Sequence, residues 1–302
     1  MPGALHEHPE GCRVHKIDST LRGNWAAEIG VLLAERRRVL IIPAYPAAGR
    51  TCVGGVVRVD GVPVAETEFG RDPTAPVTSS RPAGAFAAVE VAAVEVAAEE
   101  VATLTDLHGW LASVGRPAAV AIADAETDER IDELVAATGD RADVVIAGPA
   151  AVVGAVARWM SPGTRRGLPA LPVGPVLVVC GSLHSISRSQ AAAVRSHAGV
   201  TVIEAHRDGG TDREVVALEL AFRAHEHLAA HRTDLVVLLG GDTADAFIGD
   251  RSVTVYGSVG VGMAFGSVAI DGRPLAIITK PGGFGATNAL VDLLGTHGGV
   301  GA

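Results

Sequence analysis

The stretch VLVVCGSLHSISRSQ at residues 176–190 determines the class of fold that the sequence predicts. An apolar run ends at Cys180, a Gly-Ser turn follows, and a helical pattern begins near Ser187. Short apolar runs followed by longer Ala-rich helical stretches recur along the chain, which indicates βαβ units whose parallel strands are covered on both faces. The sequence therefore predicts an α/β protein with two three-layer α/β domains and mostly parallel sheets.

Apolar runs and helical periodicity give the boundaries of the expected elements. We expect strands at 13–17, 38–42, 118–123, 144–147, 176–180, 201–204, 235–239 and 275–279. We expect helices at 25–36, 103–114, 128–137, 150–159, 187–196 and 212–231. Over 86–101 (FAAVEVAAVEVAAEEV) strand and helix patterns compete, and a strand running into a helix is the expectation there.

The length of 302 residues suits two domains at roughly 100–200 residues each. The Pro- and Gly-rich stretch SPGTRRGLPALPVG at 161–174 lacks apolar periodicity, which is typical of a linker. We therefore expect domains at 1–160 and 175–302.

Composition and charge exclude several classes of partner and location. The formal net charge of −9 argues against a nucleic-acid partner. Cys12, Cys52 and Cys180 follow no disulfide or metal-site spacing, which fits a reducing cytoplasm. The sequence shows no signal peptide and no apolar run near the roughly 20 residues of a membrane span. A cytoplasmic protein without a membrane partner is the prediction.

Glycine-rich turns follow three predicted strands of the second half: GSLHS from Gly181, GGDT at 240–243 and KPGGFG at 280–285. Ligands of parallel sheets bind at the carboxyl ends of strands, where helix N-termini offer unpaired N–H groups to anions. Three such turns predict a nucleotide or phosphate pocket. The structural alternatives are that Ser187, His184 or Asp242 is only a helix N-cap and that the glycines only form turns.

Lysine is rare in this chain, which contains only Lys16 and Lys280. Lys280 precedes the turn with Gly282, Gly283 and Gly285, so it would place a mobile point charge beside backbone N–H groups that suit a phosphate. The turn is not a Walker A motif, because GxxxxGK[ST] is absent.

The first half carries a different cluster of polar residues. HKIDSTLRGNWAAEI places Asp18, Arg22 and Asn24 before a helix, and PAYPAAGRT places Arg50 in a turn after a strand. Arginine binds carboxylates in a bidentate manner, and Asp, Ser and Asn bind hydroxyls, so the cluster suits a small polyhydroxy carboxylate. The alternative is a capped helix with solvated surface arginines.

These blocks resemble the four-carbon acid sugar kinase family. In order, the matching segments are KIDSTLRGNWAAEI, PAYPAAGRTCVGG, VDGVPVAETEF, RDPTAPVTSS, DAETDE at 124–129, GSLHSISRSQ, GGDT and KPGGFG. The resemblance implies an ATP- and Mg²⁺-dependent phosphorylation of a tetronate or 3-oxo-tetronate. It implies an acid-sugar domain at 1–160 and a nucleotide-binding domain at 175–302.

The resemblance also assigns roles by position. It implies that Asp18, Arg22, Asn24 and Arg50 contact the acid sugar. ATP contacts are expected at Ser182, Gly240, Gly241, Asp242, Thr243 and Gly283, with Lys280 on the phosphates. The catalytic base and any side-chain metal ligands are not assigned.

The sequence departs from the family pattern in two places. Cys180-Gly181-Ser182-Leu183-His184 stands where the family has Ser-Gly-Ser-Cys-Ser, so some hydroxyls are replaced. DSTLRGN begins at Asp18, whereas the family has a strand with Asp-Asp-x-Thr-Gly well before it, so an incomplete N-terminal sheet is expected. Two explanations of the missing segment are favoured: a misassigned start codon, or a separate polypeptide that supplies it. The alternative function is that of a catalytically silent nucleotide-binding homologue or of one subunit of a split kinase. A homo-oligomer stays open as well.

Overall fold

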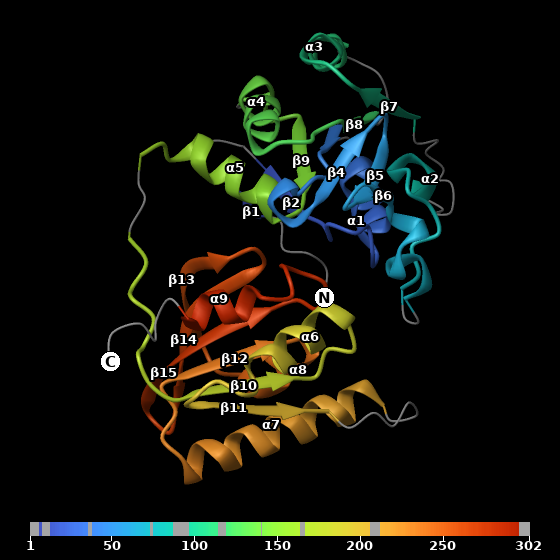
Figure 1. The fold of residues 1–302 in the computed structure, drawn as a ribbon. Coiled ribbons are helices and arrows are strands. Elements are labelled where there is room, and N and C mark those ends of the chain that lie inside the picture. The colour runs from blue at the N-terminus through green and yellow to red at the C-terminus, as the bar shows by residue number, and fades with distance from the viewer. Residues whose placement is uncertain are drawn as a thin grey trace. The chain divides into compact units, whose positions relative to one another are not determined.

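A computed structural model describes residues 6–7, 13–35, 38–72, 75–86, 97–113, 119–139, 141–163, 167–205 and 212–295. The chain divides into two compact units, residues 1–165 and 166–302 (Figure 1). The division falls inside the stretch 161–174 that we expected to be a linker. Each unit is described by itself below.

The N-terminal unit is built on a six-stranded sheet with the strand order β1-β2-β9-β3-β8-β7. All neighbouring strands are parallel except β1, which is antiparallel to β2. The predicted strands are confirmed, including the one that begins at Arg13. The strands are β1 (His6–Glu7), β2 (Arg13–Lys16), β3 (Arg38–Ile41), β7 (Ala97–Val101), β8 (Ala119–Ala123) and β9 (Val144–Gly148).

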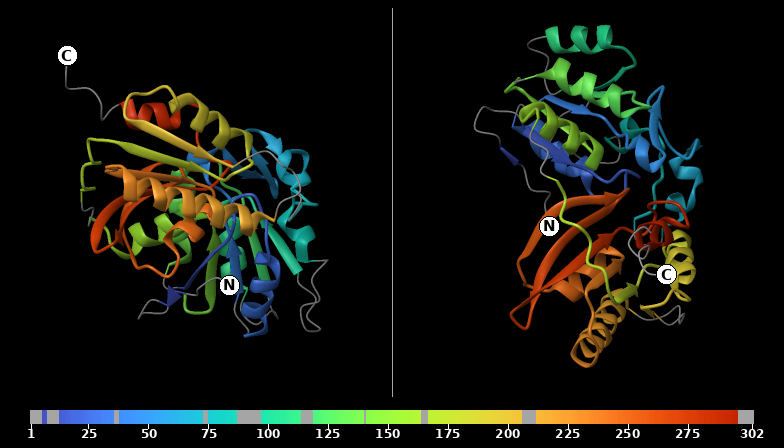
Figure 2. Two further views of the ribbon diagram at one scale, coloured as in Figure 1. Left: turned by 90° about the horizontal axis from the view of Figure 1, so that it is seen from below. Right: turned by 60° about the vertical axis from the view of Figure 1, so that its left-hand side comes forward.

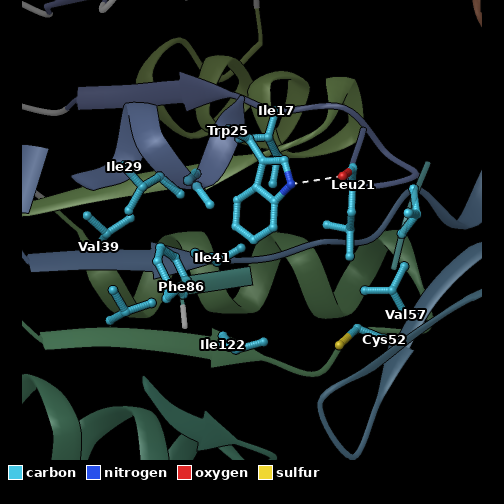
Figure 3. Packing of buried hydrophobic residues seen from close by; sticks show 14 of the residues in the cluster. Ile17, Leu21, Trp25, Ile29, Val39, Ile41, Cys52, Val57, Phe86 and Ile122 are labelled. Atoms are coloured by element: carbon cyan, nitrogen blue, oxygen red, sulfur yellow. Dashed lines mark hydrogen bonds between the residues drawn. The ribbon is translucent and has the colours of Figure 1, made fainter. Parts of the chain in front are cut away.

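Helices cover both faces of this sheet, as the continuous apolar strands require. One face packs against α3 (Leu104–Ala112), α4 (Asp128–Thr138) and α5 (Ala150–Met160). The other packs against α1 (Trp25–Ala34), where Trp25 lies among Ile29, Ile41 and Phe86 (Figure 3). The indole N–H of Trp25 donates to the Leu21 carbonyl at 2.9 Å, which ties the loop before α1 to the core.

A small antiparallel sheet of the same unit was not among the expected elements. It consists of β4 (Arg50–Val53), β5 (Val56–Val59) and β6 (Val62–Pro63). Its turns use positive φ angles at 54–55 and 60–61, which explains the paired glycines and the Asp-Gly sequence. A short helical turn, η1 (Pro46–Ala48), precedes this sheet. The short helices η2 (Val64–Glu66), η3 (Glu68–Arg71) and α2 (Pro82–Phe86) follow it.

The ambiguous segment 86–101 is only partly within the described residues. Its end forms strand β7, which runs into helix α3 after a capping box at Thr103 and Asp106. Residues 87–96 lie outside the described part.

The C-terminal unit contains a second six-stranded sheet with the order β11-β10-β12-β15-β14-β13. The first four strands are parallel, whereas β13, β14 and β15 form an antiparallel meander. The strands are β10 (Val176–Cys180), β11 (Val200–Glu204), β12 (Leu235–Leu239), β13 (Val253–Gly260), β14 (Met263–Ile270) and β15 (Arg273–Lys280). Strands β13 and β14 are additions to the expected topology.

Helices cover both faces of the second sheet as well (Figure 2). Helices α6 (Ser185–Val194) and α9 (Ala289–Gly295) pack on one face, and α7 (Arg213–Ala230) and α8 (Gly241–Ile248) pack on the other. The predicted two-domain α/β class is therefore confirmed. No helix within the described ranges is both long and apolar enough to cross a bilayer.

Candidate functional site

The three glycine-rich turns of the C-terminal unit meet at one edge of its sheet. Cys180, Leu239 and Lys280 end parallel strands and lie opposite one another in register, Cys180 beside Leu239 and Leu239 beside Lys280. The turns that follow these residues are consequently adjacent. We call this group of turns, at 181–184, 240–243 and 281–286, the glycine edge.

Backbone hydrogen bonds join neighbouring turns of the glycine edge. The Gly181 and Ser182 amides both donate to the Leu239 carbonyl, at 3.2 and 3.1 Å, and the Gly240 amide donates to the Lys280 carbonyl at 2.9 Å. A Cβ at Gly181 would lie 2.2 Å from the Thr243 hydroxyl, so only glycine fits there. Thr243 itself is buried, which places it in the packing beneath the turns.

The first turn of helix α8 is open toward the glycine edge. Gly240 is the N-cap, with φ of +121°, and it has no side chain with which to cap the first N–H groups of the helix. Such uncapped N–H groups and the helix dipole favour an anion. Gly241 starts the helix, and a Cβ built there would have no neighbour within 4 Å, so the space beside it is open.

Asp242 is exposed, and its carboxylate accepts a hydrogen bond from Arg213 at 2.8 Å. Because Gly240 is the N-cap of α8, the interpretation of Asp242 as a plain N-cap is wrong. The carboxylate lies one residue into the helix and outside the core.

Helix α6 is capped by a side chain instead. His184 Nδ1 accepts from the Ile186 amide at 3.2 Å, so the predicted capping role of His184 is confirmed. The helix begins at Ser185, not near Ser187, and the N-cap alternative for Ser187 is therefore wrong. Ser187 is fully buried, and its hydroxyl donates to the Gly282 carbonyl at 2.7 Å.

Lys280 is buried, with 1 % of its surface exposed, and is not the mobile point charge that the sequence predicted. Its ammonium donates to the Pro281 and Gly282 carbonyls at 3.0 and 3.2 Å and lies 3.5 Å from the Ser187 hydroxyl. Gln190 of α6 donates to the Phe284 and Ala286 carbonyls at 3.1 and 2.7 Å. These side chains hold the turn at 281–286 in one conformation.

Asp242 is the exposed carboxylate of the glycine edge that could contact a divalent metal ion. The described residues contain no group of three His, Cys, Asp or Glu side chains arranged to hold a metal. Mg²⁺ commonly binds through one or two carboxylates together with substrate phosphates and water. The exposed Asp242 is a carboxylate of that kind.

In the N-terminal unit, Asp18 organises the loop after β2. Its Oδ2 accepts from the Thr20 amide at 3.0 Å, from the Thr20 hydroxyl, and from the Arg22 Nε at 3.4 Å. Burial raises the pKa of Asp18, but the Arg22 charge and the Thr20 hydrogen bonds outweigh it, so the net pKa is lowered. Asp18 is thus held as a carboxylate.

Two guanidinium groups lie against one aromatic ring beside Asp18. The Arg22 and Arg50 guanidinium carbons lie 5.2 and 6.0 Å from the centre of the Phe69 ring. Arg22 also pairs with Asp72 at 3.3 Å. Burial lowers the pKa of Arg50, and nearby Asp60 and Asp18 oppose that shift, so this arginine is a buried cation. We call Asp18, Arg22, Arg50 and Phe69 the arginine cluster.

The fourth predicted sugar-site residue, Asn24, and the neighbouring Ser19 differ in their surroundings. Asn24 is exposed at the N-cap position of α1 and makes no side-chain cap. Ser19 is buried, and its hydroxyl has no hydrogen-bond partner among the described residues. A buried hydroxyl without a partner costs about 1–3 kcal/mol, which a ligand or water can recover. The structure therefore brings Asp18, Arg22 and Arg50 together and leaves Asn24 at the periphery.

The block DAETDE contributes structure at its first residue. The Asp124 carboxylate accepts from the Gly54 and Gly55 amides at 2.6 and 2.9 Å and from the Cys52 thiol at 3.5 Å. It thereby fixes the β4–β5 turn. Burial and the neighbouring Asp124 raise the pKa of the Cys52 thiol well above its usual value, which favours the neutral thiol over the reactive thiolate.

Sequence reasoning missed Phe69, Asp72, Ser187 and Gln190 as parts of these sites. Phe69 and Asp72 are brought to the arginine cluster by tertiary folding, across some 50 residues from Arg22. Their only signal was the position of Phe69 and Asp72 within the quoted blocks VDGVPVAETEF and RDPTAPVTSS. Gln190 ends the block GSLHSISRSQ, and that position was its only signal in the sequence.

Comparison with known proteins gives a consistent set of relatives. A family model described as a sugar-binding N-terminal domain matches residues 5–156. A D-threonate kinase of Bordetella bronchiseptica is 30 % identical over an alignment that covers 91 % of this chain and 75 % of the relative. A D-threonate kinase of Cupriavidus necator is 36 % identical, with 61 % of this chain and 46 % of the relative covered. The chain thus spans three quarters of the first relative and about half of the second.

A solved structure supports the fold. The crystal structure of a Haemophilus influenzae protein superposes with a TM-score of 0.58 at 17 % identity, covering 95 % of this chain and 82 % of that protein. At this identity the likeness concerns the architecture, which is the two-unit α/β arrangement described above.

Proposed function

The chain belongs to the four-carbon acid sugar kinase family, and on that premise we propose that it transfers the γ-phosphoryl group of ATP to a hydroxyl group of a four-carbon acid sugar. The family is one of kinases, and the dependence on ATP and the choice of sugar are our proposals for this chain. The observation that carries the proposal is the convergence of the three glycine-rich turns at one edge of the C-terminal sheet.

The glycine edge is the proposed ATP site. The open first turn of α8 would receive phosphate oxygens on the amides after Gly240, and the absence of a Cβ at Gly241 allows the close approach. Ser182 would add a hydroxyl donor, and Gly283 a backbone amide. Lys280 acts mainly as a positioning residue, because its ammonium bonds the carbonyls of the turn and keeps the turn's amides directed outward.

Mg²⁺ bound to the triphosphate would neutralise charge that develops during phosphoryl transfer. Asp242 is the residue that we propose to contact it, directly or through water. Protein groups contribute to this reaction chiefly by positioning and electrostatic stabilisation, since little covalent chemistry is required of them. Arg213 donates a hydrogen bond to the Asp242 carboxylate at 2.8 Å, and both side chains are exposed.

The arginine cluster is the proposed acid-sugar site. Arg50 is a buried cation whose guanidinium suits a carboxylate, while Asp18 stays ionised and can accept a hydrogen bond from a sugar hydroxyl. The buried Ser19 hydroxyl is a further group that could pair with the substrate. D-Threonate is the first candidate substrate, and other tetronates and 3-oxo-tetronates share the same carboxylate and hydroxyl chemistry.

The proposal is tested by ADP release from purified full-length chain with ATP, Mg²⁺ and a panel of D-threonate, its C2 epimer and a 3-oxo-tetronate. We expect ADP release above the ATP-only rate for at least one compound. Arg50→Met should raise the KM for that acid at least tenfold, whereas Arg158→Met, which removes an exposed arginine of the same unit, should leave it unchanged. ATP binding without sugar-dependent ADP release across the panel would contradict the kinase assignment and favour the catalytically silent homologue.

A further inference from the structure

A cavity of about 640 Å³ lies beside the glycine edge within the C-terminal unit. Its walls come from the chain at 168–171, from the end of β13 and the start of β14, and from α9. Gly285 and Ala286 also line it, and they belong to the turn at 281–286. Ligand pockets of small molecules typically have volumes of about 300–1,000 Å³.

The strand register shows that the cavity and the glycine edge lie at the same end of the sheet, where β15 finishes. Ala264 pairs with Thr279 in the antiparallel β14–β15 ladder, so the β13–β14 turn lies at the end where β15 finishes. Gly262 of that turn packs on Phe284, because a Cβ built at Gly262 would lie 2.8 Å from the Phe284 side chain. The turn at 281–286 therefore contains both Gly283, a proposed phosphate contact, and Gly285, which lines the cavity two residues later.

The chemistry of the walls differs from that of the glycine edge. Most lining side chains are apolar, including Leu171, Val259, Met263 and Leu293. Ser258 and Asp292 are the polar side chains among the described lining residues. Ser258 already donates to the Gly260 carbonyl at 2.6 Å, and Asp292 accepts from Asn288 at 2.7 Å. A carboxylate on an otherwise apolar wall repels phosphate and tolerates a neutral, flat group.

We propose that this cavity receives the base of the nucleoside triphosphate and selects it by shape and apolar contact. The inference rests on the proposed function, because it extends the same nucleotide from the glycine edge across the turn at 281–286. An apolar wall discriminates weakly between groups of similar size, whereas strong discrimination needs dedicated hydrogen-bonding groups. Since the side chains of the described lining residues provide no uncommitted donor, the site binds ATP and GTP with affinities that differ by less than about tenfold.

Calorimetric binding of ATP, GTP and inorganic triphosphate to the full chain tests the inference. The variant Ala289→Leu places a larger side chain in the wall next to Gly285, whose own Cβ position is 3.3 Å from the Ala289 Cβ. Ala229→Leu makes the same change at an exposed position of α7 and serves as the matched control. We expect Ala289→Leu to raise the Kd of ATP and of GTP at least tenfold while the Kd of triphosphate changes less than twofold.

Three results would overturn the inference. Equal affinity of the unaltered protein for ATP and triphosphate would mean that the base makes no contact, although the phosphate part of the proposed site would stand. Unchanged ATP binding by a folded Ala289→Leu protein would place the base elsewhere. Failure of both ATP and triphosphate to bind the unaltered protein would refute the nucleotide site itself. If Ala289→Leu does not fold, Val259→Phe alters the opposite wall and is judged by the same affinities.

Discussion

A substitution at Gly241 should affect ATP binding without affecting the stability of the fold. Gly241 is the first residue of α8, and a Cβ there would meet no atom within 4 Å. Alanine is favoured over glycine by about 1 kcal/mol in a helix interior, and we expect about 0.5 kcal/mol at this first position. Gly241→Ala should therefore leave the free energy of unfolding unchanged or slightly increased.

The same substitution should weaken ATP binding. If phosphate oxygens lie on the first amides of α8, the added methyl group occupies the space that they need. We expect the Kd for ATP to rise at least tenfold, which corresponds to about 1.4 kcal/mol. Urea unfolding followed by circular dichroism gives the stability, and calorimetry gives the Kd.

Gly240→Ala is the matched comparison, because Gly240 is required by the backbone. Its φ of +121° is unfavourable for alanine, and the new Cβ would lie 3.2 Å from the Thr243 hydroxyl and 3.3 Å from the Ser182 amide. We expect a loss of at least about 2 kcal/mol in the free energy of unfolding. A Gly241→Ala protein of normal stability that binds ATP as tightly as the unaltered chain would refute the placement of phosphate at this helix.

Further substitutions probe the two sites separately. Lys280→Met removes the buried ammonium that donates hydrogen bonds to the turn at 281–286. We expect the free energy of unfolding to fall by about 2 kcal/mol and the Kd for ATP to rise at least tenfold. An unchanged free energy of unfolding and an unchanged Kd would show that Lys280 does not support the site. Asp18→Asn should lower stability by about 1 kcal/mol at pH 7. Because the pKa of Asp18 is lowered in the folded chain, that difference should be present above the ordinary carboxyl pKa near 4 and disappear as the pH falls through the folded pKa; a pH-independent difference in urea unfolding would contradict the ionised role. Phe69→Leu removes the ring beneath Arg22 and Arg50, which should cost about 1–2 kcal/mol and raise the KM for the acid sugar several-fold, and an unaltered KM would exclude the ring from the site.

The glycine edge could be predicted from the sequence because its position follows from the topology of a parallel sheet. Strands such as Val176–Cys180 and Leu235–Leu239 are continuously apolar, which specifies buried parallel strands, and parallel strands bring their carboxyl ends to one edge. The turns after them therefore had to meet wherever the strands were neighbours. The same reasoning did not reveal β13 and β14, because outward-facing residues and glycines interrupt their apolar pattern.

The parts that could not be predicted depend on contacts between segments distant in sequence. Lys280 was expected on phosphate because of its neighbours in sequence, yet in the folded chain its ammonium lies 3.5 Å from the hydroxyl of Ser187, 93 residues away. Phe69 lies against Arg22 and Arg50 in the folded chain, although 47 and 19 residues separate it from them in sequence. Local pattern gives the position of a turn, whereas the direction of its side chains depends on tertiary packing.

The unequal burial of the two lysines has a practical consequence for chemical labelling. Lys280 is almost fully buried, whereas Lys16 is exposed, so an amine-reactive reagent acting on the folded chain encounters one accessible lysine side chain. The side chain as a whole is exposed, but its ammonium donates to the Ile17 carbonyl at 2.7 Å and is partly desolvated, which lowers the pKa of Lys16 despite the opposing charge of Asp18. A fluorophore attached there would lie two residues from Asp18, where its emission could report occupancy of the arginine cluster.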